Sequence, residues 1–158
     1  METSITYYQP TTQPDNPKVA IVVSKWNSMI TDKLLAGAIN ALVAQGVAED
    51  KISVVRCPGA FELPLATDQA IRNLKPDGVV ALGVVIRGGT PHFEYVCDAV
   101  TRGILDMNLK YGVPVAFGVL TTDNVEQALE RAGDQGNKGA EAALATLEMI
   151  DLSRKMEP

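Results

Sequence analysis

The sequence contains few of the residues from which metal sites and disulfide frameworks are built. Its 158 residues include two cysteines, Cys57 and Cys97, and a single histidine, His92. Two cysteines make no disulfide framework and have no metal-ligand spacing, and one histidine excludes a histidine-rich metal site. We therefore expect a protein that binds no metal and resides in a reducing cytoplasm.

Long apolar stretches and an excess of positive charge are also missing. The longest charge-free apolar run, Gly78–Ile86, has nine residues, whereas a membrane-spanning helix needs about 20. Residues 1–17 are polar and proline-rich, without the basic-then-apolar pattern of a signal peptide. The net charge of −5 argues against nucleic acid or an anionic membrane as a partner, because phosphate is bound by basic clusters.

Short β-branched runs alternate with longer segments of helical periodicity. The runs are continuously apolar, which is typical of a parallel sheet covered on both faces, and they span Val19–Val23, Ile52–Val55, Val79–Ile86 and Val113–Leu120. Helical spacing covers about residues 30–43, 63–74, 91–110 and 137–154. A short helix is expected after Asp123 as its N-cap, with Glu126 as capping-box partner.

This alternation predicts an α/β fold, a three-layer α/β/α sandwich of the flavodoxin-like kind with a four-stranded parallel sheet. We expect residues 1–17 to form an N-terminal arm and residues 18–158 to form one domain. In such sheets ligands bind beyond the carboxyl ends of the strands, so the segments that follow the strands are the first candidates for a site.

A glycine-rich segment, Gly88-Gly89-Thr90-Pro91-His92, follows the third predicted strand. Two glycines allow close backbone approach, Thr90 is a good N-cap, and Pro91 suits the first helical position. Such a strand-to-helix turn favours a bound anion, although an ordinary tight turn with a capped helix explains these residues equally well. His92 is placed for proton transfer beside the turn, or is simply a surface or core histidine.

Four further side chains are candidates, each with a purely structural alternative. Trp26, the only tryptophan, is a stacking platform for a planar heterocycle or a core or interface anchor. Glu62, near a helix start, accepts hydrogen bonds from hydroxyls or stabilises the helix dipole. Arg131 and Lys138 hold a phosphate, or make a helix C-terminal contact and a solvated surface charge. Cys57 is interpreted as a small apolar residue.

Five segments follow one another along nearly the whole chain, from about Lys18 to Ser153. They are PGAFELP (58–64), LGVVIRGGTPHFEYV (82–96), FGVLTT (117–122), ERAG (130–133) and GNKG (136–139). Together, in this order, they closely resemble the signature of the 6,7-dimethyl-8-ribityllumazine synthase family.

The resemblance implies an enzyme of the penultimate step of riboflavin synthesis that uses no cofactor. It would condense 5-amino-6-(D-ribitylamino)uracil with 3,4-dihydroxy-2-butanone 4-phosphate and release phosphate and water. His92 matches the proton-transfer residue, and the phosphate would be held by Gly89, Thr90, Arg131 and Lys138. The aminouracil and its ribityl chain would contact Trp26, Ala60, Phe61, Glu62, Val84, Val85, Ile86 and, from the adjacent subunit, Phe117.

The resemblance also implies self-association into homopentamers that share their sites. Ser4–Tyr8 would add a strand to a neighbour's sheet. The segment Gly133–Gly136 is one residue shorter than in the common bacterial form, which leaves a pentamer and a sixty-subunit icosahedral shell both open. Riboflavin synthase is a further candidate partner. Two readings compete with the enzyme: a flavodoxin-like module that binds flavin or nucleotide without catalysis, and a structural shell protein with an inactive site.

Overall fold

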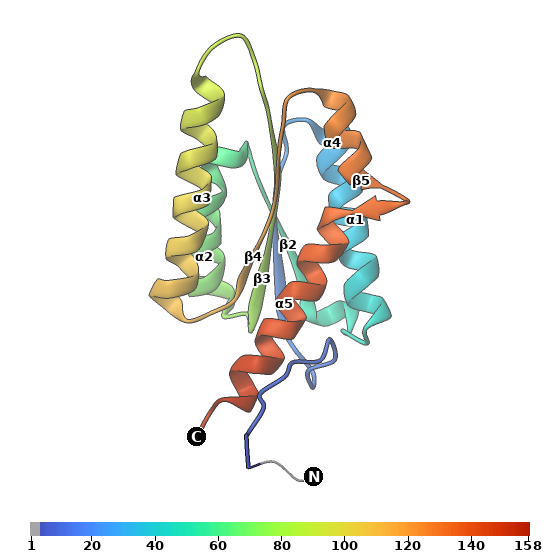
Figure 1. Ribbon diagram of the computed structural model, residues 1–158, viewed down its shortest axis with the longest axis vertical. Helices are drawn as coiled ribbons and strands as arrows, with labels where there is room; N and C mark the ends of the chain where they lie inside the picture. The colour runs from blue at the N-terminus through green and yellow to red at the C-terminus, as the bar shows by residue number, and fades with distance from the viewer. Residues whose placement is uncertain (1–3) are drawn as a thin grey trace.

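A computed structural model describes residues 4–158 of the chain. Its main sheet has four parallel strands in the order β2-β1-β3-β4. The strands are β1 (Val19–Ser24), β2 (Ile52–Cys57), β3 (Gly78–Ile86) and β4 (Val115–Thr122). Figure 1 shows α2 (Leu63–Leu74) and α3 (His92–Tyr111) on one face, and α1 (Ser28–Ala44), α4 (Val125–Arg131) and α5 (Lys138–Lys155) on the other. The predicted flavodoxin-like α/β/α sandwich is confirmed.

The two central strands are buried because helices cover both of their faces. Successive side chains of a strand point to opposite faces, so Ile21 of β1 packs in the core beneath α1 and α5, whereas its neighbour Val22 packs beneath α2 and α3. Each such side chain contributes about 1.5–3 kcal/mol when it is fully buried. The continuous apolar runs of β1 and β3 therefore correspond to strands with two buried faces. The expectation of burial on both faces is wrong for β2 and β4, which are partly exposed because they lie at the edges of the sheet.

Gly46 lies just beyond the C-terminal end of α1. Gly46 has a φ of 93°, in the left-handed region that glycine adopts without strain. Its N–H donates to the Val43 carbonyl at 3.0 Å, and the Val47 N–H donates to the Leu42 carbonyl at 3.0 Å. This pair of bonds is a Schellman motif, which satisfies carbonyls that the helix end leaves free.

Two predicted helix caps are wrong. Asn124, not Asp123, caps α4: its Oδ1 accepts the Gln127 N–H at 2.9 Å, and its extended backbone allows this contact. The Asp123 carboxylate instead accepts a hydrogen bond from Arg87. At the start of α3, Pro91 occupies the N-cap position and the helix begins at the following residue. Thr90 lies before the proline, where helical backbone is disfavoured, and does not cap the helix.

The segment before α5 contains a small antiparallel pair that the sequence did not predict. β5 (Ala132–Gly133) pairs with β6 (Gly136–Asn137). Asn137 fixes this hairpin because its amide donates to the carbonyls of Lys33 and Ala132, at 3.1 and 3.2 Å. Its Oδ1 also accepts the Ala140 N–H and so caps α5, which starts one residue later than expected.

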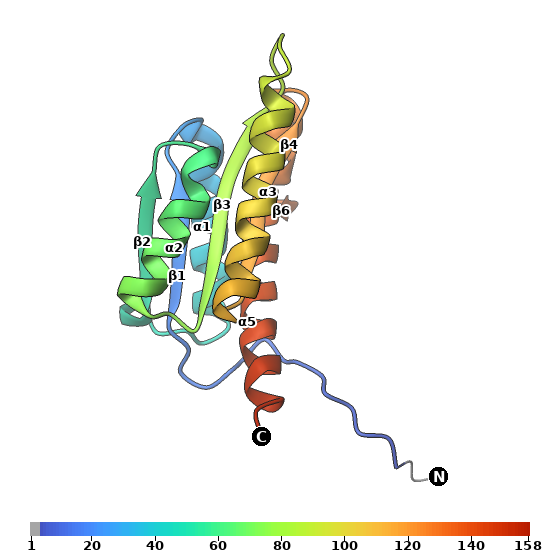
Figure 2. The same cartoon turned by 90° about the vertical axis from the view of Figure 1, so that its left-hand side faces the viewer.

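The N-terminal segment runs along the base of the sandwich before it reaches β1. The Thr11 N–H donates to the Asp151 carboxylate, and the Lys155 ammonium donates to the Gln9 carbonyl, so α5 holds this part of the arm. Figure 2 shows residues 4–8 projecting away from the sandwich. Residues 1–3 of the predicted arm lie outside the described residues. Among residues 4–158, no helix is long and apolar enough to cross a membrane.

Candidate functional site

A cavity of about 520 Å³ lies beyond the carboxyl ends of β1, β2 and β3, next to α3. Eight of the predicted site residues line it: Trp26, Ala60, Phe61, Glu62, Val84, Val85, Ile86 and His92. Sequence reasoning missed four others, Ser24, Asn27, Gly59 and Val96. Asn27 and Gly59 adjoin the predicted residues Trp26 and Ala60, Ser24 is the last residue of β1, and Val96 lies one helical turn after His92 on α3.

Trp26 lies at the rim of this cavity and is largely exposed, with 63% of its surface accessible. Its backbone N–H donates to the Pro58 carbonyl at 2.9 Å, which ties the loop after β1 to the loop after β2. The indole lies so close to Gly59 that a Cβ at that position would meet its Cε3 at 2.4 Å. The residue is therefore no core anchor of this chain, and a glycine at position 59 is needed to seat the ring.

Asn27, the next residue, has left-handed backbone with a φ of 61°. Asparagine adopts this region more readily than most residues. Its carbonyl accepts the N–H groups of Ile30 and Thr31 at 2.9 and 3.1 Å, which starts α1 immediately after the loop. An asparagine directly after the loop tryptophan was the sequence signal for this sharp turn beside the cavity.

Glu62 brings a carboxylate into the cavity from the short helix η2 (Ala60–Glu62), just before α2. Its Oε2 is buried and has no hydrogen-bond partner among the described residues. A buried acceptor without a partner costs about 1–3 kcal/mol, and more when it is charged. Because this oxygen is buried, it does not fit the alternative in which Glu62 is exposed to water and only stabilises the helix dipole. A ligand that donates a hydrogen bond to it would recover that cost.

Cys57 ends β2 close to the same carboxylate. Burial, reinforced by the negative charge of Glu62, raises the pKa of its thiol to about 11. The Sγ atom lies 3.6 Å from the Gly59 carbonyl. Because the thiolate is the nucleophilic form, this cysteine is inert near neutral pH, as its interpretation as a small apolar residue requires.

His92 is the first residue of α3 and lines the cavity with an exposed side chain. Gly89 and Thr90, in the loop before it, are exposed and line neither large cavity. A Cβ at Gly88 or Gly89 would meet no atom of the described chain within 4 Å. Packing within the chain therefore does not demand these two glycines, and the space around the turn is open to a ligand.

The remaining predicted residues, Phe117, Arg131 and Lys138, line a second cavity of about 560 Å³. It lies along β4, at the edge of the sheet, and is closed by α4 and α5. The Arg131 guanidinium donates to the Gln127 carbonyl at 3.0 Å, which is the helix C-terminal contact considered above. The Lys138 ammonium lies 3.2 Å from the Glu141 carboxylate, a lining residue that sequence reasoning missed.

The two cavities have no lining residue in common. One chain therefore does not bring Trp26 and His92 together with Arg131. The first cavity offers an indole, a carboxylate and an imidazole, which suit a planar polyhydroxylated molecule and proton transfer. The second offers two cationic side chains at an open sheet edge, which suit an anion. Phe117 of β4 is 44% exposed beside them.

Comparison with known protein families identifies the family of this chain. The family model of 6,7-dimethyl-8-ribityllumazine synthase matches residues 16–154. That range includes every residue that lines the two cavities. The match covers nearly the whole chain, and the chain belongs to the 6,7-dimethyl-8-ribityllumazine synthase family.

Proposed function

We propose that this protein condenses 5-amino-6-(D-ribitylamino)uracil with 3,4-dihydroxy-2-butanone 4-phosphate to form 6,7-dimethyl-8-ribityllumazine. The observation that carries the proposal is the cavity at the strand ends, in which Trp26, Glu62 and His92 meet. Its buried Glu62 oxygen without a partner favours a ligand rich in hydroxyl donors, such as a ribityl chain.

The aminouracil binds in the first cavity. Trp26 stacks on the planar ring, and the strand-end residues Val84, Val85 and Ile86 border the ring on the side of the sheet. Glu62 accepts hydrogen bonds from the ribityl hydroxyls, beside Ala60 and Phe61. These contacts orient the amine toward the second substrate, and orientation alone supplies a large part of the acceleration in such condensations.

His92 moves protons for the reaction. The substrate amine attacks the ketone carbon, and the resulting carbinolamine loses water to give an imine. Phosphate then leaves, and the second amine closes the ring with loss of water. Each step transfers protons to or from nitrogen and oxygen, which a positioned imidazole accelerates. No step needs a strong nucleophile, in keeping with the inert thiol of Cys57, and we propose that no cofactor takes part.

The phosphate binds where the turn that carries Gly89 and Thr90 meets Arg131 and Lys138 of a neighbouring protomer. Two observations support a shared site. Arg131 and Lys138 line a cavity that has no residue in common with the cavity of Trp26 and His92, and β4, which bears this second cavity, is an edge strand. Such an arrangement also brings Phe117 to the aminouracil of the adjacent protomer. A ring of five protomers, with Ser4–Tyr8 paired to a neighbour's sheet, completes the proposal.

An assay of lumazine formation, read by fluorescence, tests the proposal. The wild-type protein is expected to consume the aminouracil only when the butanone phosphate is present. The His92→Ala variant should turn over more slowly, by about 10²–10⁴-fold, without complete loss. A purified protein that carries flavin but leaves the aminouracil unreacted would instead show a flavin-binding module.

A further inference from the structure

The turn between β3 and α3 has little of its own to hold it in place. Among the described residues, no loop hydrogen bond fixes the backbone of positions 88–90, and two of these three positions are glycines. Figure 1 shows the turn rising beyond the ends of the strands. Without other contacts a segment of this kind samples many conformations, and a ligand that needs one of them loses affinity.

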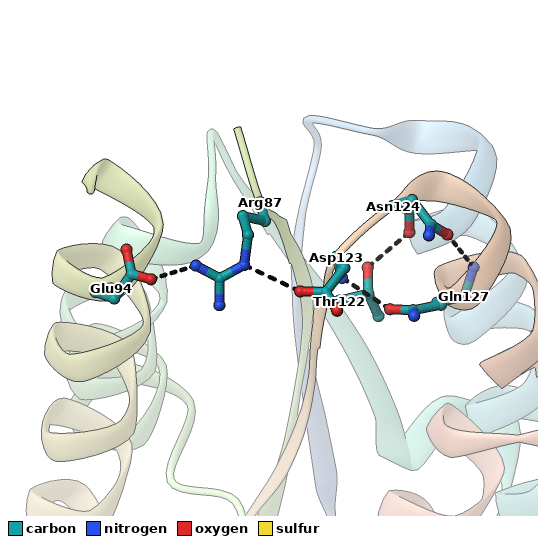
Figure 3. Close-up of polar contacts among 6 residues, drawn as sticks. All are labelled: Arg87, Glu94, Thr122, Asp123, Asn124 and Gln127. Carbon is teal, nitrogen blue, oxygen red and sulfur yellow. Dashed lines mark hydrogen bonds and ion pairs between the residues drawn. The ribbon is translucent and has the colours of Figure 1, made fainter. Parts of the chain in front are cut away.

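Two charged side chains join the ends of this turn. Arg87 precedes the turn and Glu94 follows it, and the Arg87 Nη1 donates to the Glu94 Oε1. On its other side the Arg87 Nε donates to the Asp123 carboxylate at 3.0 Å. Figure 3 shows the guanidinium between the two carboxylates, one on α3 and one after β4. The Arg87–Glu94 contact thus closes the turn at its base.

Further contacts hold Arg87 itself in position. Its backbone N–H donates to the Thr122 carbonyl at 2.8 Å, which continues the pairing of β3 with β4. Its guanidinium lies over the Phe93 ring, 4.3 Å from the centroid. The hydrogen bond from Arg87 is the main cause of a lowered pKa of Glu94, so the carboxylate is charged near neutral pH.

The ion pairs of Arg87 are exposed, with 45% of the arginine side chain and 53% of the Glu94 side chain accessible. Exposed ion pairs contribute little to the stability of a whole domain. Their loss should therefore leave the fold intact and change only the turn that they close.

We propose that Arg87 is a positioning residue: together with Glu94 and Asp123 it fixes the turn that carries Gly89 and Thr90, and it does not bind the substrate phosphate itself. This inference rests on the proposed function, in which that turn receives the phosphate. The geometry favours positioning over direct binding because the Nε and Nη1 donors of Arg87 already face carboxylates.

The Glu94→Ala variant gives a test in which a purely electrostatic role and a positioning role of Glu94 predict opposite changes in the KM for the phosphate substrate. Removal of a carboxylate near a bound phosphate lowers the KM for the phosphate substrate if only charge matters. Loss of the closing contact instead raises this KM, by about fivefold, because binding must then order the turn. The KM for the aminouracil should change less than about twofold, since the first cavity is untouched. A merely unstable variant would lose active protein, which lowers the apparent kcat and leaves both KM values unchanged.

The Asp98→Ala variant is the matched control. It removes the same charge one turn farther along α3 and breaks the exposed pair between Asp98 and Arg102, whose atoms lie 3.1 Å apart. Its KM values should equal those of the wild type. The Arg87→Lys variant keeps the charge but loses the planar fork that bridges two carboxylates, and it should raise the KM for the phosphate substrate as Glu94→Ala does.

Limited trypsin digestion gives a readout that does not depend on activity. Trypsin cleaves after arginine, so the Arg87–Gly88 bond reports on the turn in the wild type, in Glu94→Ala and in Asp98→Ala alike. We expect cleavage at this bond to be at least about threefold faster in Glu94→Ala only.

The outcomes separate this inference from the proposed function. If the wild type makes lumazine but Glu94→Ala shows neither a raised KM nor faster cleavage, the positioning role is wrong and the function stands. If Arg87→Lys raises the KM and Glu94→Ala does not, Arg87 contacts the phosphate directly. If the wild type makes no lumazine, the proposed function fails, and the cleavage rates alone decide whether the pair fixes the turn.

Discussion

Complementation between two defective chains tests whether the two cavities belong to one site. Trp26 lines the first cavity and Arg131 lines the second. If each site combines the first cavity of one protomer with the second cavity of its neighbour, a Trp26→Ala chain can supply an intact second cavity. An Arg131→Ala chain can supply an intact first cavity to the same site.

The expected size of each defect follows from the contact that it removes. Loss of an aromatic stacking partner costs about 1–3 kcal/mol, or roughly 5–150-fold in kcat/KM. Loss of a charge-assisted hydrogen bond to phosphate costs about 1.5–3 kcal/mol, or roughly 10–150-fold. Both side chains are well exposed, 63% for Trp26 and 48% for the Arg131 side chain, so neither substitution should unfold the chain.

Random assembly of the two variants in equal amounts places an intact Trp26 beside an intact neighbouring Arg131 in about one quarter of the sites. Chains with different affinity tags, co-expressed and purified through both tags, should therefore show about one quarter of the wild-type kcat/KM. Co-assembled Trp26→Ala and His92→Ala chains are the control, because both defects lie in the first cavity and no site becomes intact. If the co-assembled Trp26→Ala and Arg131→Ala chains are no more active than the mean of the two variants assembled separately, the shared site is refuted.

Three other properties can be measured on the purified protein. The Gly139→Ala variant should unfold at a lower temperature, with a loss of about 1–3 kcal/mol in the free energy of unfolding. The cause is its new Cβ, which would lie 2.1 Å from a main-chain oxygen of α1. Gly136→Ala is the control, because a Cβ at that position meets no atom within 4 Å. The hydrogen bond from Tyr111 lowers the pKa of Asp68. The charged carboxylate therefore stabilises the folded protein above the ordinary carboxyl pKa, and this stabilisation is lost as the pH falls through the lowered pKa of Asp68. Between pH 6 and pH 3 the melting temperature of Asp68→Asn should fall less than that of the wild type. Since the pKa of Cys57 is about 11, iodoacetamide at pH 8 should modify it ~100-fold more slowly in the native protein than in the urea-unfolded chain.

The sheet and its helices could be predicted from the sequence because their signals are local and strong. The range 63–74 is the same in the prediction and in α2, where a proline in the first turn and a regular apolar face agree. The helix caps were less predictable, since two neighbouring polar residues compete for the same role. Asp123 was the plausible cap of α4, but Arg87, 36 residues away in the chain, engages its carboxylate, and no local pattern reveals such a partner.

The first cavity could be predicted because the segments that follow the strands of a parallel sheet all lie at the carboxyl ends of those strands. Eight predicted residues line it, although they come from four different segments of the chain. What the sequence could not reveal is the state of a single atom, the buried Oε2 of Glu62. Its lack of a partner depends on how η2 packs against α3 and β3, and this packing is a property of the folded chain.

The separation of Arg131 and Lys138 from the first cavity follows from the strand order. β3 lies between β1 and β4, so residues on the outer side of β4 face away from the cavity that the ends of β1, β2 and β3 form. At the end of β3, the Arg87 contacts occupy the space between α3 and the loop after β4. Arg131 lies at the end of α4, which covers the opposite face of the sheet from α3. If the phosphate is held by both the turn after β3 and Arg131, a second protomer must bring that arginine, and the open edge of β4 is the side from which it can come.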